Sequence, residues 1–181
     1  MHSDNLEQEI LKEHSRRQVV RIGTWVGRNR QRFGRLMECY LHGDTVLSQR
    51  SAWIMSYCGE RHPQLLDGWL PKILSKVEEE DNHIAVKRNA LRVLRFVEFP
   101  RRILGKVVTI CCNELENPDS PVAVRVYAMD LLLTILEEEP DFANEILAVV
   151  RSMLPHAGPG LSVCIRRTMK KLQEVRGMRS V

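Results

Sequence analysis

The chain lacks long hydrophobic runs, strand-type alternation of apolar and polar residues, and any Cys-x-x-Cys motif. A membrane-spanning helix needs roughly 20 consecutive apolar residues, so no membrane segment is expected. Without alternation, strands are not expected either. The five cysteines are an odd number, and the polar segment 1–9 does not resemble a signal peptide. These features predict reduced thiols and a cytoplasmic location.

Glycine and proline are also sparse, at 10 and 8 of 181 residues, whereas 44% of the chain is hydrophobic. This composition predicts one globular domain, residues 1–181, with a real core. The net charge of +4 is mild for a nucleic-acid-binding domain. Seven arginines and no acid lie between Arg16 and Arg35. We expect them to keep the protein soluble or to neutralise the acidic loops 78–81 and 137–139, in preference to tracking phosphates.

Apolar residues recur at spacings of three and four along nearly the whole chain, which predicts an all-α protein. The first segment, 1–28, reads as an N-terminal cap that starts near Asp4 and is either one helix or two helices broken near Ser15. Asp119-Ser120-Pro121 predicts a further helix start, with a capping residue before a first-turn proline. The remaining sequence predicts four antiparallel helix pairs: 30–60, 63–98, 100–138 and 140–176.

Three segments superimpose at a constant step of 38 residues, anchored on Ala52, Ala90 and Ala128. A regular step of this size is typical of stacked helical repeats. A small alanine lets two helices approach closely, and the residues four and seven positions later lie on the same helical face. At the next step, position 166, an arginine replaces the alanine. This change predicts a terminal repeat with a polar outer face.

The repeated segments resemble HEAT repeats. Trp69-Leu-Pro71 resembles the first-helix motif of that family, and Val124-Arg-x-x-Ala128-x-x-x-Leu132-x-x-Ile135 resembles its second-helix motif. The resemblance implies an α-α superhelix of HEAT/armadillo type, with a kinking proline in the first helix of the second pair. The step of 38 is shorter than the roughly 40–47 residues usual for the class.

The chain is also similar to a group of small bacterial HEAT-like proteins of unassigned function. Some of that group carry an adenylosuccinate lyase label. The Ser-Ser-containing loop motif of that lyase is missing here, and the chain is much shorter. No other catalytic motif is present, so we expect no enzyme activity and no cofactor. His62 and His83 are isolated and no pair has metal-ligand spacing, so no metal site is expected.

In such arrays the second helices usually line the concave face, and there the chain carries arginines and aromatic residues. Both residue types are common at partner surfaces, although a solvated helix face would carry arginines too. A basic stripe is expected at positions 88, 92 and 95. The predicted partner-binding residues are Arg50, Trp53, Tyr57, Arg88, Arg92, Arg95 and Tyr127.

Three functions are compatible with these features. The first is a non-enzymatic module or scaffold that holds a protein or peptide partner. The second is a nucleic-acid-binding module resembling HEAT-like alkylpurine DNA glycosylases, with Trp53 and Asp130 as rough counterparts of their tryptophan and carboxylate. The third is a small-molecule enzyme that uses Asp130 and Tyr127. The sequence names neither the partner nor the oligomeric state.

Overall fold

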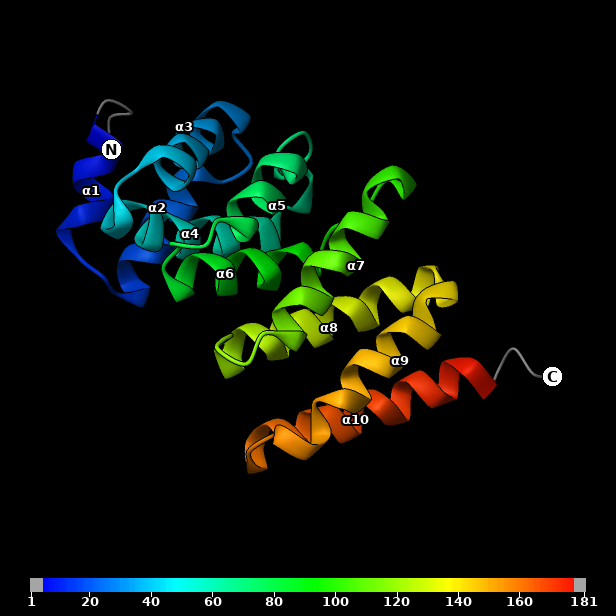
Figure 1. The fold of residues 1–181 in the computed structure, drawn as a ribbon. Helices are drawn as coiled ribbons and strands as arrows, with labels where there is room; N and C mark the ends of the chain where they lie inside the picture. Colours follow the sequence, from blue (N-terminus) through cyan, green and yellow to red (C-terminus); the bar gives the residue numbers. More distant parts are fainter. Residues whose placement is uncertain (1–4, 178–181) are drawn as a thin grey trace. The chain divides into compact units, whose positions relative to one another are not determined.

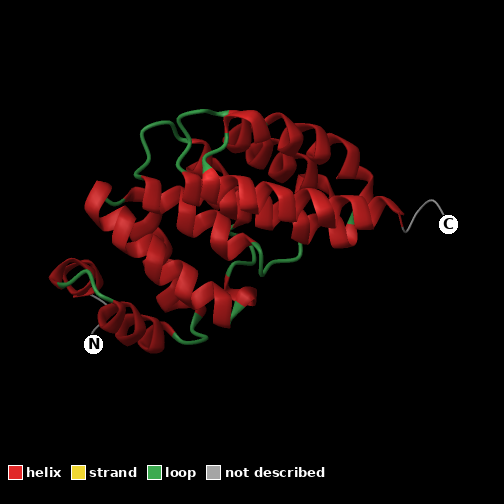
Figure 2. Ribbon diagram, turned by 90° about the horizontal axis from the view of Figure 1, so that it is seen from below, coloured by secondary structure: helices red, strands yellow, loops and turns green. Residues whose placement is uncertain are grey.

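The structure, a computed structural model, describes residues 5–177, and every regular element among them is a helix (Figure 2). The chain divides into two compact units, residues 1–98 and residues 99–181. That both belong to the single domain expected from the sequence stays a prediction.

The first unit is built around α4, which packs against α1, α2, α3 and α6 (Figure 1). Helices α3 and α4 form the first pair, and α5 and α6 form the second. The elements are α1 (Leu6–Lys12), α2 (Arg16–Val26), α3 (Arg30–His42), α4 (Thr45–Arg61), the short 3₁₀ helix η2 (Pro63–Leu65), α5 (Leu70–Glu78) and α6 (Ile84–Leu94).

The N-terminal segment is two helices, and the break falls at Ser15. The Ser15 hydroxyl accepts a hydrogen bond from the Gln18 amide at 3.1 Å and so caps α2. The Gln18 side chain in turn donates to the backbone carbonyl of Glu9, which fixes α2 against α1. Hydrogen bonds from Lys12 and Arg21 hold the pKa of the buried Glu9 carboxyl below its ordinary value. Asp4, expected to start the first helix, lies outside the described residues.

Two prolines of the second pair start helices and do not kink one. The sequence predicts a helix from Pro63, but only the 3₁₀ turn η2 forms there, and α5 begins at Leu70. Gly68 adopts a positive φ of 80°, a conformation that favours glycine, and it separates the two elements. Pro71 therefore lies in the first turn of α5, where its missing N–H leaves no helical hydrogen bond unmade. The expected kinking role of Pro71 is wrong for this reason.

The second unit contains two further helix pairs, α7 with α8 and α9 with α10. In Figure 1 the two members of each pair run in opposite directions, as their short connections predict. The elements are α7 (Arg101–Glu116), α8 (Val122–Glu138), η3 (Pro140–Phe142), α9 (Ala143–Ser152), η4 (Leu154–His156) and α10 (Pro159–Gly177).

The prediction that Ser120 caps α8 is wrong. The helix begins at Val122, its N-cap position is Pro121, and no side chain caps it. The Ser120 hydroxyl donates instead to the Glu114 carboxylate at 2.6 Å, and both residues are buried. Because that carboxylate lies in the interior, it needs a hydrogen-bond donor more than an exposed helix amide does.

The three anchor alanines lie in the core. Ala52 on α4, Ala90 on α6 and Ala128 on α8 are each 0% exposed. Arg166, at the next 38-residue step, is exposed on α10, as a polar end face requires. The step thus separates positions that pack from the position where the pattern ends, and the predicted all-α repeat of helix pairs is confirmed.

Candidate functional site

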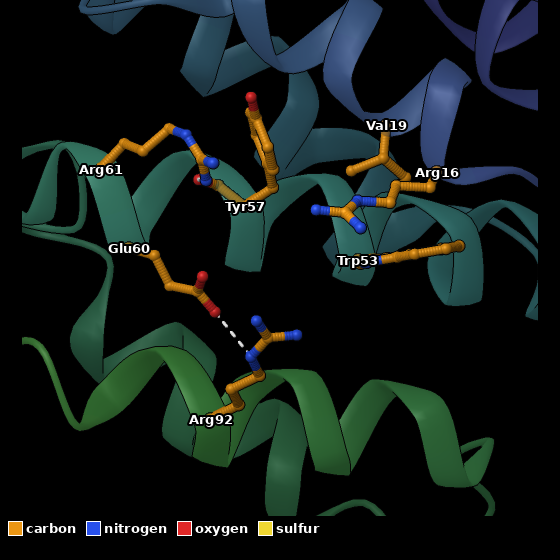
Figure 3. Close-up of a pocket in the computed structure, with 7 residues that line it drawn as sticks. All are labelled: Arg16, Val19, Trp53, Tyr57, Glu60, Arg61 and Arg92. Carbon is orange, nitrogen blue, oxygen red and sulfur yellow. Dashed lines mark hydrogen bonds and ion pairs between the residues drawn. The ribbon is translucent and has the colours of Figure 1, made fainter.

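A pocket in the first unit brings together side chains from three helices (Figure 3). Its volume is about 280 Å³. Helix α4 contributes most of the wall through positions 53, 57, 60 and 61, which share one helical face. The lining residues are Arg16 and Val19 from α2, Trp53, Tyr57, Glu60 and Arg61 from α4, and Arg92 from α6.

Tyr57 is seated by a glycine on one side and an arginine on the other. A Cβ atom added at Gly23 would lie 2.4 Å from Cδ1 of Tyr57, so only glycine lets the ring approach α2 this closely. The Arg61 guanidinium lies 3.6 Å from the ring centroid and donates to the Tyr57 carbonyl at 3.2 Å. These contacts combine a cation–π interaction with a hydrogen bond and hold both side chains in place.

Trp53 lies one turn before Tyr57 on the same wall. The ring of His14, between α1 and α2, meets the Trp53 ring edge-on, with centroids 5.5 Å apart and an interplanar angle of 80°. Aromatic pairs prefer such edge-to-face arrangements. Trp53 is half-buried, and it lines the pocket together with Arg16 (Figure 3). The indole therefore offers an apolar surface next to a positive charge.

An ion pair between α4 and α6 borders the pocket. Nε of Arg92 lies 2.6 Å from Oε1 of Glu60, and the two side chains are 34% and 18% exposed. The Ser56 hydroxyl also approaches the Glu60 carboxylate, at 3.4 Å. Because Glu60 binds the Nε edge, the two terminal nitrogens of Arg92 point into the pocket (Figure 3).

The pocket carries an excess of positive charge. Three arginines and one glutamate line it, which gives a net charge of +2. Arg16 is exposed and pairs with no carboxylate of the described chain, and the Arg61 guanidinium contacts the Tyr57 ring and the Tyr57 carbonyl. Such a surface attracts anions.

The structure places three of the seven predicted binding residues, Trp53, Tyr57 and Arg92, in this one pocket. Arg88 is half-buried and outside its lining, and Arg95 is the C-terminal cap of α6, with its guanidinium 5.7 Å from the Phe96 ring. Tyr127 lies on α8 in the second unit. The basic stripe as a contact surface stays a prediction.

Sequence reasoning missed four lining residues: Arg16, Val19, Glu60 and Arg61. Arg61 and Glu60 follow Tyr57 and Trp53 at four and seven positions, so helical spacing could have found them. Arg16 and Val19 depend on the packing of α2 against α4, and no sequence pattern signals that contact.

Arg50 has a structural role. Its guanidinium donates to the Leu11 carbonyl at 2.6 Å and to the Ile10 carbonyl at 3.4 Å. Both carbonyls belong to the last turn of α1, where no helical amide is left to bind them. Arg50 thus fastens the end of α1 to α4.

We expect Arg50→Ala to lower the free energy of unfolding by about 1–3 kcal/mol, because charged hydrogen bonds to backbone are lost. Urea unfolding followed by circular dichroism measures the change. Arg28→Ala removes an exposed arginine from the same unit and should change stability by less than about 0.5 kcal/mol. Equal stability of Arg50→Ala and the unaltered protein would show that these hydrogen bonds do not support the fold.

The buried thiols are poor nucleophiles. Cys39, Cys58, Cys111 and Cys112 are buried, and Cys164 is half-buried. Burial raises the pKa of Cys58 to about 12 and that of Cys39 to about 11. Burial likewise raises the pKa of Cys112 to about 11, and it raises the pKa of Cys111 further still. These groups stay protonated near neutral pH, and they fill the core.

The two residues named for an enzyme, Tyr127 and Asp130, both lie on α8. Asp130 pairs with Arg167 at 3.2 Å. A pocket of about 400 Å³ in the same unit is lined by neither Asp130 nor Tyr127, and it contains a single carboxylate, Glu116. Among the described residues, no group of His, Cys, Asp or Glu side chains is arranged to hold a metal ion. No helix within residues 5–177 has the length and apolarity to cross a bilayer.

Four of the seven arginines between Arg16 and Arg35 have neighbours that offset or cover their charge. Arg17 pairs with Glu13 at 3.2 Å, Arg30 with Asp67 at 3.4 Å, and Arg21 with Glu9. Arg32 lies over the ring of Trp25, 4.8 Å from its centroid. For Arg17, Arg21 and Arg30 the paired acids are Glu13, Glu9 and Asp67, which lie outside the acidic loops 78–81 and 137–139.

Comparison with known proteins yields one family. The profile of the HEAT repeat domain matches residues 6–172. No curated protein and no solved structure matches the chain.

Proposed function

Because the chain belongs to the HEAT repeat domain family, we propose that it is a non-enzymatic binding module that holds an acidic peptide segment of a protein partner. HEAT repeats form helical repeat scaffolds, and partners usually dock on their surfaces. The segment would bind in the pocket between α2, α4 and α6. The single observation that carries the proposal is the net charge of +2 beside two aromatic rings in that pocket.

Arginine and aromatic side chains are the residues that contribute most to protein interfaces. Trp53 and Tyr57 offer flat apolar surfaces, and both are held by neighbours before any partner arrives. A pre-ordered wall loses little side-chain entropy on binding. The guanidinium groups of Arg16 and Arg92 supply donors for carboxylates, which they bind with good geometry.

A peptide fits this unit better than nucleic acid does. A protein that tracks a phosphate backbone needs many unpaired cations along one face. Here Arg17, Arg21 and Arg30 are paired with carboxylates, and Glu60 neutralises part of the pocket itself. The positive charge that remains is local, which suits a short acidic segment.

The test uses degenerate peptide pools, so that the result does not depend on one chosen partner sequence. One pool has a fixed core of Asp and Glu, and the other has Asn and Gln at the same positions. We expect the acidic pool to bind more tightly and its affinity to fall as salt is raised. Duplex and single-stranded DNA of mixed sequence are titrated alongside. Tighter binding of either DNA would favour a nucleic-acid module, and failure of the acidic pool to bind would overturn the proposal.

A further inference from the structure

The pocket holds its positive charge in an arrangement that is more specific than a basic patch. The Glu60 carboxylate lies 2.6 Å from Nε of Arg92, so it occupies the Nε edge of the guanidinium. The terminal nitrogens of Arg92 and the guanidinium of Arg16 point into the same space, beside Trp53 (Figure 3). Glu60 thus positions Arg92 and leaves its other donors to a ligand.

The donors come from three helices. Arg16 stands at the start of α2, Arg61 in the last turn of α4 and Arg92 in the last turn of α6. A carboxylate is planar, has two oxygens and carries one negative charge. A phosphate monoester has three terminal oxygens in a tetrahedral arrangement, so it can accept from donors that approach from several directions.

The net charge of the pocket also favours a phosphorylated ligand. The lining has a net charge of +2, and a single carboxylate would neutralise only half of it. A phosphorylated side chain carries about −1.5 to −2 at pH 7 and forms charge-assisted hydrogen bonds with arginine clusters. The aromatic wall of Trp53 and Tyr57 then contacts the apolar part of the same side chain.

We infer that the pocket recognises a phosphorylated side chain on the partner segment, through the terminal nitrogens of Arg16 and Arg92 with Arg61 at the rim. This inference rests on the proposed function and narrows its ligand from an acidic peptide to a phosphopeptide. The phosphate belongs to a protein partner, because the pocket is a single local site and not a track.

The experiment compares degenerate peptide pools that differ at one fixed position. That position holds phosphoserine, phosphotyrosine, glutamate or the unphosphorylated residue. We expect at least one phosphorylated pool to bind about tenfold or more tightly than the glutamate pool, a difference of about 1.4 kcal/mol. Arg16→Gln should remove most of that preference. The exposed Arg102→Gln on α7 in the second unit is the matched control, and it should keep the preference.

Each outcome separates the two proposals. Equal binding of the glutamate and phosphorylated pools, both weakened by Arg16→Gln, would overturn the phosphate inference and leave the acidic-peptide function intact. Binding of neither pool would overturn both. Tighter binding of a 5′-phosphorylated single-stranded DNA than of the phosphopeptide pools would show that the phosphate is a nucleic-acid one, and it would overturn the inference.

Discussion

Replacing Ala128 with leucine is expected to lower the free energy of unfolding by about 1–3 kcal/mol. Ala128 is 0% exposed on α8, so the added carbons have no room without displacing neighbouring helices. Protein interiors are close-packed, and overpacking forces side chains out of their preferred rotamers. Ala52 and Ala90 occupy equivalent positions in the first unit and should respond in the same way.

The matched control lies on the same helix. Ala123 is exposed, so Ala123→Leu should change stability by less than about 0.5 kcal/mol. Urea unfolding followed by far-UV circular dichroism measures both variants. If Ala128→Leu were as stable as Ala123→Leu, the anchor alanines would not be close-packing positions, and the 38-residue step would lose its physical meaning.

Arg16→Glu is expected to weaken binding of the acidic peptide pool by about tenfold or more, because it lowers the pocket charge from +2 to 0. The substitution should not harm the fold. Arg16 is the first residue of α2, where a negative charge interacts favourably with the helix dipole. Fluorescence anisotropy with a labelled pool measures the affinity.

Two further variants make the result specific to the pocket. Arg102→Glu changes the net charge by the same amount in the first turn of α7, and it should bind like the unaltered protein. Glu60→Gln keeps an acceptor for Arg92 and removes the negative charge, so it should tighten binding by roughly twofold to fivefold. A general loss of structure would weaken binding in every variant. Weakening by Arg102→Glu as great as by Arg16→Glu would therefore contradict a local site.

The sequence predicted the repeat well because repeats depend on local spacing. The alanines at 52, 90 and 128 mark buried positions on three helices. Helical periodicity is seen in the apolar residues three and four positions apart within each segment. The break at Ser15 was visible as an alternative, since serine is a good capping residue. The prediction that Ser120 caps α8 failed because its hydroxyl binds the Glu114 carboxylate. Glu114 lies on the preceding helix, and the rules for helix caps consider only residues near the helix start.

The candidate site was predicted only in part. Trp53, Tyr57 and Arg92 were identified from their types and their equivalent positions in the repeat. Arg50 looked equally suitable, but its Nη1 donates to the carbonyls at the end of α1. That contact joins residues about 40 apart, and only the packing of α1 against α4 creates it. Tertiary contacts of this kind decide which arginines remain open to a partner.

The central claim is that the pocket between α2, α4 and α6 is where the partner binds, and the three tryptophans test it directly. Trp53 lines the pocket, whereas Trp25 and Trp69 do not. The measurement is a nitrogen–proton NMR spectrum of the three indole N–H groups during titration with the acidic peptide pool. The account predicts that the Trp53 signal shifts with the added peptide while the signals of Trp25 and Trp69 stay in place. Saturable binding that leaves the Trp53 signal unmoved would contradict it.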